Sequence, residues 1–381
     1  MRRSGMGWIN PDCWRGFWSY PKPPPVEFSR ILPDNAPELP DLTLIPDHVQ
    51  KPGYYYTGKP EVVPQVPVIW NLEQIDKIRS SCKIASGALN LGESLVAPGV
   101  TTEKIDSEIR EFILSHGAYP SPFNFKGFPK SISCSVNNVA AHGIPDAREL
   151  EPGDIINIDI TVFKDGFHGD CSDTFPVGDI DPYAAKLIDI SRECLDISIL
   201  RCKDGELYRT IGETIDKCAK KNKFSTIQIL LGHGIGTFFH GPPDIYHCLN
   251  SYPGKMAAGM VFTIEPCLSE GDRRIRFLRD GWTAVTVDNS RTAQAEHTIL
   301  ITQTGAEILT SRSGDMLTSR PGDVLCNIPG EELSSRFGEV LSNRPEEELS
   351  SRSGEVLSSF RDVFSNKPTD KVSSRLGEKE S

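Results

Sequence analysis

Acidic and histidine side chains stand in apolar runs of this chain, where an unpaired charge is costly. Asp159 and Asp170 belong to "NIDITVFKDGFHGD", His233 to "LLGHGIG", Glu265 to "FTIEP" and Glu296 to "AEHTILIT". No lysine or arginine neighbours Asp159. Its charge needs another partner, because desolvating an unpaired carboxylate costs several kcal/mol. Four carboxylates and one imidazole suit divalent first-row ions, and this excess of negative charge suits a pair of them.

The elements that carry these residues fall in one mixed α and β region, which we place at residues 70–310. Apolar residues at helical spacing alternate along the chain with short runs of strand-like alternation. Helices are expected at 71–96, 101–118, 182–201 and 207–221, and strand-rich regions at 131–180 and 225–310.

The two flanks differ from this region in composition. Residues 1–69 form a proline-rich lead that we expect to be extended, as a linker or a surface strap, with a partner-binding proline motif as the alternative. Its first twenty residues lack the apolar core of a secretory signal, and a short organellar presequence is left open. Residues 311–381 repeat an octad such as "SRSGDMLT" or "SRFGEVLS". Their low apolar content predicts disorder, with a stacked or partner-induced structure as the alternative.

Composition narrows the class of protein. The chain has 381 residues and a net charge of −11, which argues against a nucleic-acid partner held by a basic surface. No apolar run approaches the length of a spanning helix, so we expect no membrane insertion. The ten cysteines are scattered without a C-x-x-C pair. They fit free thiols better than a disulfide framework or a zinc module.

The motifs and their order resemble type 1 methionine aminopeptidases of peptidase family M24. The resemblance is carried by "FPKSISCSVNNVAAHGIPD", "NIDITVFKDGFHGDCSDTF", "GHGIGTFFH", "FTIEP" and "AQAEHT". The stretch "HVQKPGYYYTG" is most similar to the mitochondrial and plastid branch. The family implies an α+β pita-bread fold, with two similar α/β halves around a curved antiparallel sheet. A halfway repeat is not visible in the sequence, so the pseudo-symmetry follows from the resemblance alone.

The resemblance also implies roles for the five candidate ligands. Asp159 would chelate one ion, His233 and Glu265 the other, and Asp170 and Glu296 would bridge both. The expected cofactor is a pair of divalent ions, of cobalt, manganese, iron or zinc. The implied reaction removes the initiator methionine with metal-activated water when the second residue is small and uncharged.

Further residues match the family's catalytic and pocket positions. His142 would contact the scissile amide, His240 would lie near the developing oxyanion, and Glu265 would act as general base. Without the resemblance, His142 reads more readily as a turn histidine. An apolar pocket for methionine is expected from Phe125, Phe128, Phe239 and Trp282, although each could be a core aromatic. The sequence departs from the family pattern near this pocket at Pro122, Ser133 and Ala141.

Two other functions compete with this interpretation. An X-Pro aminopeptidase or prolidase would share the fold, but such enzymes usually carry a longer amino-terminal domain. A non-catalytic binding module would lose metal ligands, whereas all five positions are kept here. The expected partners are the amino-terminal peptides of newly made proteins, with no nucleic acid and no membrane, and the expected state is a monomer. The branch resemblance predicts a mitochondrial location, with the cytoplasm as the alternative.

Overall fold

A nine-stranded antiparallel sheet carries the runs that hold the candidate ligands. The computed structural model describes residues 28, 30, 39–313 and 315. The main strand order is β1-β4-β5-β14-β9-β7-β8, with β2 beside β4 and β15 beside β14. These strands are β1 (Tyr119–Pro120), β2 (Ser133–Val136), β4 (Ile155–Lys164), β5 (Phe167–Pro176), β7 (Leu231–Gly234), β8 (Gly241–Tyr246), β9 (Val261–Ile264), β14 (Glu296–Ile301) and β15 (Ala306–Ile308).

Two three-stranded sheets accompany the large one, in the orders β13-β10-β6 and β11-β12-β3. Their strands lie in the chain segments that connect strands of the large sheet. Their members are β3 (Val139–Ala141), β6 (Ser225–Thr226), β10 (Cys267–Ser269), β11 (Ile275–Phe277), β12 (Ala284–Thr286) and β13 (Thr292–Gln294). Two short 3-10 helices complete the elements, η2 (Leu42–Leu44) and η3 (Phe125–Gly127).

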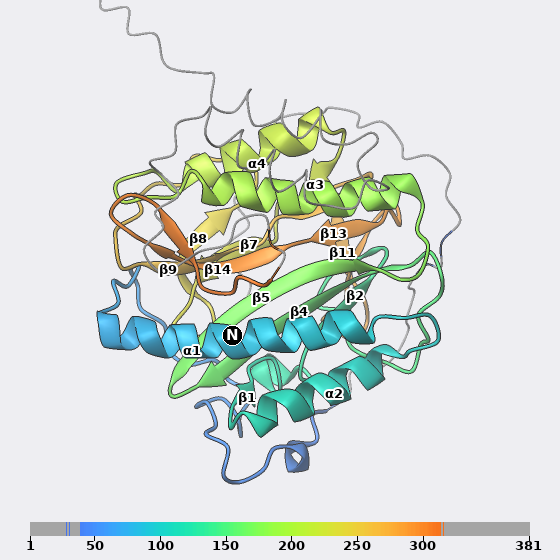
Figure 1. Ribbon diagram of the computed structural model, residues 1–381, viewed down its shortest axis with the longest axis horizontal. Helices are drawn as coiled ribbons and strands as arrows, with labels where there is room; N and C mark the ends of the chain where they lie inside the picture. Colours follow the sequence, from blue (N-terminus) through green and yellow to red (C-terminus); the bar gives the residue numbers. More distant parts are fainter. Residues whose placement is uncertain (1–27, 29, 31–38, 314, 316–381) are drawn as a thin grey trace, which may run out of the picture. The chain divides into compact units, whose positions relative to one another are not determined.

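Two pairs of helices flank the strands. In Figure 1, α1 and α2 lie below β4 and β5, and α3 and α4 lie above the sheet. A capping box of Asn71 and Gln74 begins α1, and the Thr101 hydroxyl accepts from Lys104 N–H to begin α2. All four helices lie within their predicted ranges: α1 (Leu72–Leu95), α2 (Thr102–Ser115), α3 (Pro182–Ile199) and α4 (Arg209–Lys221).

Strand β4 shows why an apolar run can hold an aspartate. Ile156, Ile158 and Ile160 are fully buried in the core against α1 and α2. Successive side chains of a strand point to opposite faces, so Asp159 and Thr161 face away from these helices. The isoleucines stabilise the fold by burial, roughly 2 kcal/mol each, and the opposite face is left for polar chemistry.

The lead segment supplies buried aromatic residues to the folded unit. Tyr54 is 2 % exposed, and its hydroxyl donates to the Ser121 carbonyl at 2.7 Å. Its ring meets the edge of Phe125 at 5.1 Å between centroids. Residues 45–70 therefore contribute packing as well as length. The presequence considered above and most of the repeat tail lie outside the described residues.

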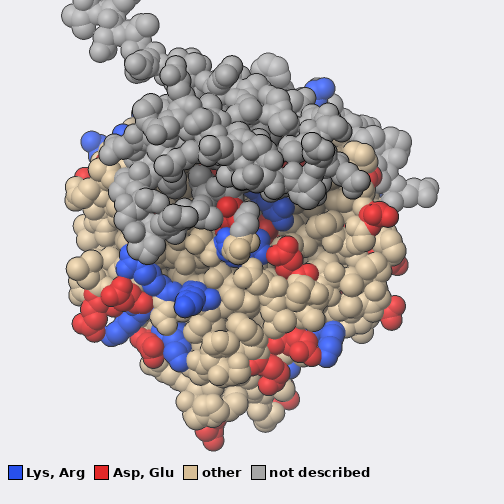
Figure 2. Space-filling model, viewed as in Figure 1, with Lys and Arg blue, Asp and Glu red and all other residues tan. Residues whose placement is uncertain are grey.

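The surface carries mixed charge, and the described cysteines are buried. Acidic and basic side chains are interspersed on the face shown in Figure 2. In the part of the chain that the structure describes, no helix combines the length and apolar character needed to cross a membrane. The eight cysteines described there are all buried free thiols.

Candidate active site

Cross-strand register brings three of the acids together on the large sheet. Asp159 on β4 lies directly opposite Ser172 on β5, and Ser172 lies opposite Glu296 on β14. Asp170 is two residues from Ser172 on the same face of β5. One carboxylate oxygen from each of the three acids lies within 4.8 Å of the others. That spacing suits divalent ions held between carboxylates.

His233 and Glu265 join this cluster from the other half of the sheet. His233 Nε2 lies 3.8 Å from Asp170 Oδ2 and 3.7 Å from Glu265 Oε1. Glu265 directly follows β9, whose Ile264 pairs with His297, so it arrives beside Glu296. The glycines around His233 have a packing reason. A Cβ on Gly232 would lie 2.3 Å from the Thr263 carbonyl oxygen, and one on Gly234 would lie 2.0 Å from that of Pro242.

The acids repel one another in the absence of a cation. Burial raises the pKa of Asp159 to about 7. Burial and then the charge of Asp159 raise the pKa of Glu265 to about 8. Burial and neighbouring carboxylates hold the pKa values of Asp170 and Glu296 well above their ordinary range. No lysine or arginine of the described chain forms an ion pair with any of these four acids.

The histidine completes a donor set that fits a divalent metal. Burial lowers the pKa of His233 to about 4, so its imidazole is neutral near pH 7, as a metal ligand must be. Oxygen donors with one neutral imidazole match the ligand preferences of first-row dications. A dication would replace the missing counter-charge, so the residues present fit the group that the motifs imply.

The sequence analysis did not identify the residues that donate hydrogen bonds to Asp170 and Glu265. The Thr161 hydroxyl donates to Asp170 Oδ1 at 2.7 Å, and the Thr263 hydroxyl donates to Glu265 Oε1 at 2.9 Å. Gln294 Nε2 donates to Glu265 Oε2 at 3.2 Å. Thr161 and Thr263 stand two residues from the candidate ligands Asp159 and Glu265, so strand alternation was the signal that could have found them.

The candidate catalytic histidines lie at loop positions beside this cluster. His240 precedes β8, and its ring centroid lies 4.2 Å from that of His233. His142 follows β3 in the left-handed region, at φ 57°, a conformation that is uncommon outside glycine. Burial and then the charge of Lys126 lower the pKa of His142 to about 4. Burial and then His233 lower the pKa of His240 well below its usual value. Both imidazoles are therefore neutral near pH 7.

The four candidate pocket aromatics lie around these histidines in two groups. Phe125 packs against Phe239 at 4.8 Å and against His240 at 5.2 Å. Phe128 meets Trp282 edge-on at 5.1 Å, and Trp282 lies 6.0 Å from His142. In each group one ring, Phe125 or Phe128, comes from η3 or from the residue that directly follows it. The other ring comes from a segment more than 100 residues later in the chain.

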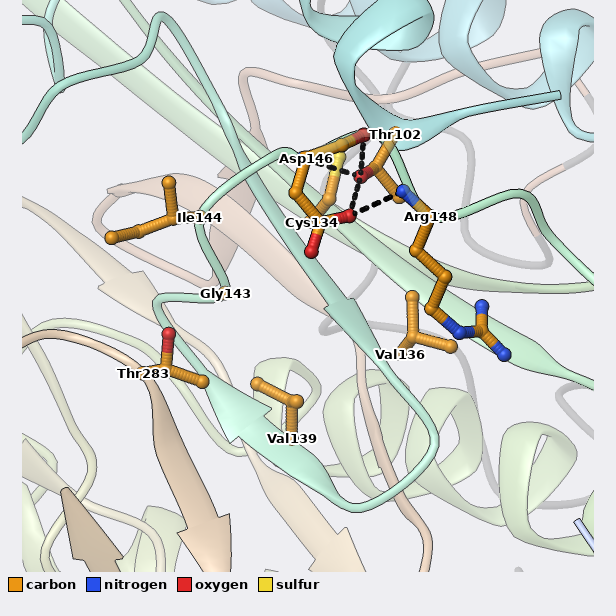
Figure 3. Close-up of a pocket in the computed structure, with 9 residues that line it drawn as sticks. All are labelled: Thr102, Cys134, Val136, Val139, Gly143, Ile144, Asp146, Arg148 and Thr283. Atoms are coloured by element: carbon orange, nitrogen blue, oxygen red, sulfur yellow. Dashed lines mark hydrogen bonds between the residues drawn. The ribbon is translucent and has the colours of Figure 1, made fainter. Parts of the chain in front are cut away.

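The departures from the family pattern occupy different surroundings. Ser133 is opposite Asp159, on the face of the candidate ligands. Its neighbour Cys134 points the other way, into a small cavity of about 30 Å³ with Gly143 and Asp146 (Figure 3). That cavity has room for a water molecule rather than a peptide. Ala141 ends β3 beside His142.

Three further histidines lie beside residues of the candidate site. His168 accepts or donates at Nδ1 with the Ser121 hydroxyl at 2.8 Å and stacks on Phe239. His247 Nε2 accepts from the Glu265 backbone N–H at 3.1 Å. His297 Nδ1 lies 3.0 Å from the Thr310 hydroxyl.

The raised carboxyl pKa values predict how the metal-free protein responds to pH. Asp159 and Glu265 bind protons in the folded state up to about pH 7 and 8, whereas unfolded they lose them near pH 4. Stability therefore falls as pH rises through that window, by up to about 1.4 kcal/mol per pH unit for each proton. The lowered pKa of His233 acts oppositely, but only below about pH 6.5. Between pH 6.5 and 8, the melting temperature of chelator-treated protein should fall, and added Mn²⁺ should remove the trend. A rise with pH would contradict it.

Comparison with known proteins gives close relatives over this region. The sequence pattern of metallopeptidase family M24 matches residues 76–303. Methionine aminopeptidase 1D, mitochondrial, of Homo sapiens is 46% identical over 269 residues, which is 70% of this chain and 79% of that protein. Methionine aminopeptidase 1B, chloroplastic, of Arabidopsis thaliana is 43% identical over 290 residues, with 75% and 76% covered. The crystal structure of methionine aminopeptidase from Rickettsia prowazekii has a TM-score of 0.63 and 38% identity, covering 65% of this chain and 100% of that one. This likeness confirms the α+β pita-bread fold that the motifs predicted.

Proposed function

The chain belongs to metallopeptidase family M24 and within it to the methionine aminopeptidases, and from this premise we propose how its own residues remove the initiator methionine. The enzyme is a metalloaminopeptidase that hydrolyses the first peptide bond of newly made proteins. The observation that carries the proposal is the meeting of Asp159, Asp170 and Glu296 within 4.8 Å, beside His233 and without a paired cation among the described residues.

We propose that this cluster holds two divalent ions. Asp159 would hold one ion, His233 and Glu265 would hold the other, and Asp170 and Glu296 would contribute to both. When bound, the ions supply a water of lowered pKa and polarise the first peptide carbonyl. Four carboxylates meet here and would carry four negative charges when ionised, which two dications would balance and one would not.

Glu265 is the proposed general base. Thr263 and Gln294 each donate to one of its carboxylate oxygens, and His247 accepts its backbone N–H. These contacts fix the direction of the carboxylate, which a positioned general base requires.

His142 and His240 are proposed to act as neutral hydrogen-bonding groups. Their lowered pKa values leave each imidazole with one N–H near pH 7. His240, 4.2 Å from the ring of His233, donates towards charge that develops on the carbonyl oxygen. His142 contacts the scissile amide and assists the departing amine. The Trp282 edge beside His142 and the wall of Phe125, Phe128 and Phe239 receive the methionine side chain.

The proposed substrates are amino-terminal peptides whose second residue is small and uncharged. We propose a mitochondrial or other organellar location, which the names of the relatives from Homo sapiens and Arabidopsis thaliana support. Imaging of the tagged full-length chain tests this, and a diffuse cytoplasmic signal would contradict it.

Hydrolysis of matched peptides tests the proposed activity. The purified chain should release methionine from Met-Ala-Ser only with added Mn²⁺ or Co²⁺, and it should leave Ala-Pro peptides uncleaved. Cleavage of Ala-Pro alone would favour the X-Pro alternative, and no metal-dependent release from either peptide would favour a binding module.

Replacing His142 with alanine should lower kcat roughly a hundredfold and leave two ions bound, because His142 is no proposed ligand. Metal content by elemental analysis and kcat for Met-Ala-Ser check this. Loss of one ion from the His142→Ala protein would show that the residue belongs to the metal site instead.

A further inference from the structure

A row of four residues crosses the large sheet on the face of the metal ligands. Ser133 on β2 is directly opposite Asp159 on β4, Asp159 is opposite Ser172 on β5, and Ser172 is opposite Glu296 on β14. We call these four residues the serine row. Residues directly opposite in antiparallel strands have Cβ atoms about 5 Å apart and share a face, so each serine adjoins a proposed ligand.

The hydroxyls of Ser133 and Ser172 in the serine row are buried, and neither forms a hydrogen bond with a described residue. Ser133 is 5% exposed and Ser172 is 2% exposed. Among the described residues, neither Oγ has a hydrogen-bond partner. Burial and neighbouring carboxylates raise the pKa of Glu296, and the nearby Ser172 hydroxyl partly offsets this rise. Its Oγ still falls short of hydrogen-bond geometry with any described residue. An unpaired buried hydroxyl is destabilising, so two of them beside carboxylates call for an explanation.

The other two proposed ligands on this face already have hydroxyl donors. Thr161 donates to Asp170 at 2.7 Å, and Thr263 donates to Glu265 at 2.9 Å. Asp159 and Glu296 lack a comparable bond among the described contacts, and the serines are the hydroxyls that stand beside them. Each carboxylate of the site is therefore matched with one neighbouring hydroxyl.

We propose that Ser133 and Ser172 are positioning residues whose hydroxyls donate to Asp159 and Glu296 when these carboxylates bind metal. The inference rests on the proposed two-ion site. A hydrogen-bond donor to a carboxylate ligand fixes its orientation and raises metal affinity. Ser133 adjoins Asp159 alone, so it acts on the ion that Asp159 chelates. Ser172 lies between Asp159 and the bridging Glu296, so it acts on both ions.

Metal titration of the full-length chain tests this assignment. Ser133→Ala should weaken one of two Mn²⁺ sites roughly tenfold, and Ser172→Ala should weaken both, measured by calorimetry against a competing chelator. Ser133→Thr keeps the hydroxyl and should restore wild-type affinity. Ser131→Ala is the matched control, because Ser131 also has a buried hydroxyl without a partner among the described residues but lies outside the serine row. The d–d absorption of Co²⁺-loaded protein should change in the first two variants only.

The outcomes separate this inference from the proposed function. A wild-type chain that binds fewer than two Mn²⁺ would overturn the metal site itself. Two ions in wild type with unchanged affinities in Ser133→Ala and Ser172→Ala would overturn the inference alone. An effect of Ser133→Ala on KM with unchanged metal affinity would make Ser133 a pocket residue. Equal losses of Mn²⁺ affinity in Ser131→Ala, Ser133→Ala and Ser172→Ala would show that the effect comes from packing alone.

Discussion

Replacing Asp170 with asparagine should abolish methionine release and at the same time make the metal-free protein more stable. The amide removes a proposed bridging ligand, which supplies several kcal/mol of charge stabilisation, so activity should fall by more than about a thousandfold. The substitution also removes a buried carboxyl group, whose pKa is raised by desolvation and by the carboxylates of Asp159 and Glu265. Thr161 can still donate to the remaining carbonyl oxygen.

The opposite signs of these two effects distinguish a metal ligand from a structural acid. Asp154 is the matched control, because it is 2% exposed and accepts from Asn137 at 2.6 Å and from Arg148 at 2.8 Å. Asp154→Asn should lower the melting temperature and preserve two bound ions. Peptide release, elemental analysis and thermal unfolding with a chelator measure all three quantities. Retained turnover with two ions in Asp170→Asn would refute the bridging role.

Cutting the chain after Thr310 should destabilise the protein, whereas cutting it after Asp315 should not. The Arg312 guanidinium pairs with Asp173 on β5 and with Glu93 on α1, at 3.0 Å for the latter, and lies 5.4 Å above the Phe175 ring. The Arg312 and Asp173 side chains are only 10% and 8% exposed. Removing one partner of a buried pair costs about 3 kcal/mol, or roughly 6–12 °C in melting temperature for a domain of this size.

The described residues Arg312 and Asp315 also contact the strands that carry the proposed ligands. Asp315 Oδ2 lies 3.8 Å from His297 Nε2, next to Glu296 on β14, while Asp173 lies three residues from Asp170 on β5. We therefore expect that deletion of residues 316–381 keeps both activity and melting temperature. Arg312→Ala in the full-length chain should reproduce the loss seen on deletion of 311–381. Equal stability of both truncated chains would show that Arg312 contributes nothing measurable, with Arg192 sufficing for Asp173.

Local sequence was enough to predict where the helices lie and which residues are the proposed ligands. Helical periodicity and caps act within a few residues, so α1 to α4 lie where the pattern predicted them. An aspartate in a run of isoleucines is a local contradiction, and such contradictions are expected at functional sites. The residue types alone then selected a divalent metal over other partners.

Only the tertiary structure decided which residues are neighbours. Asp159 and Glu296 are far apart in the chain, and they meet because both pair with Ser172 on β5. Pairing register depends on which face of each strand is buried and on the turns between strands, so a single run does not identify its partner strand. The donor Gln294, the serines beside Asp159 and the ion pairs of Arg312 belong to this second kind of information. Sequence determined what chemistry the side chains can perform, and the fold decided which of them perform it together.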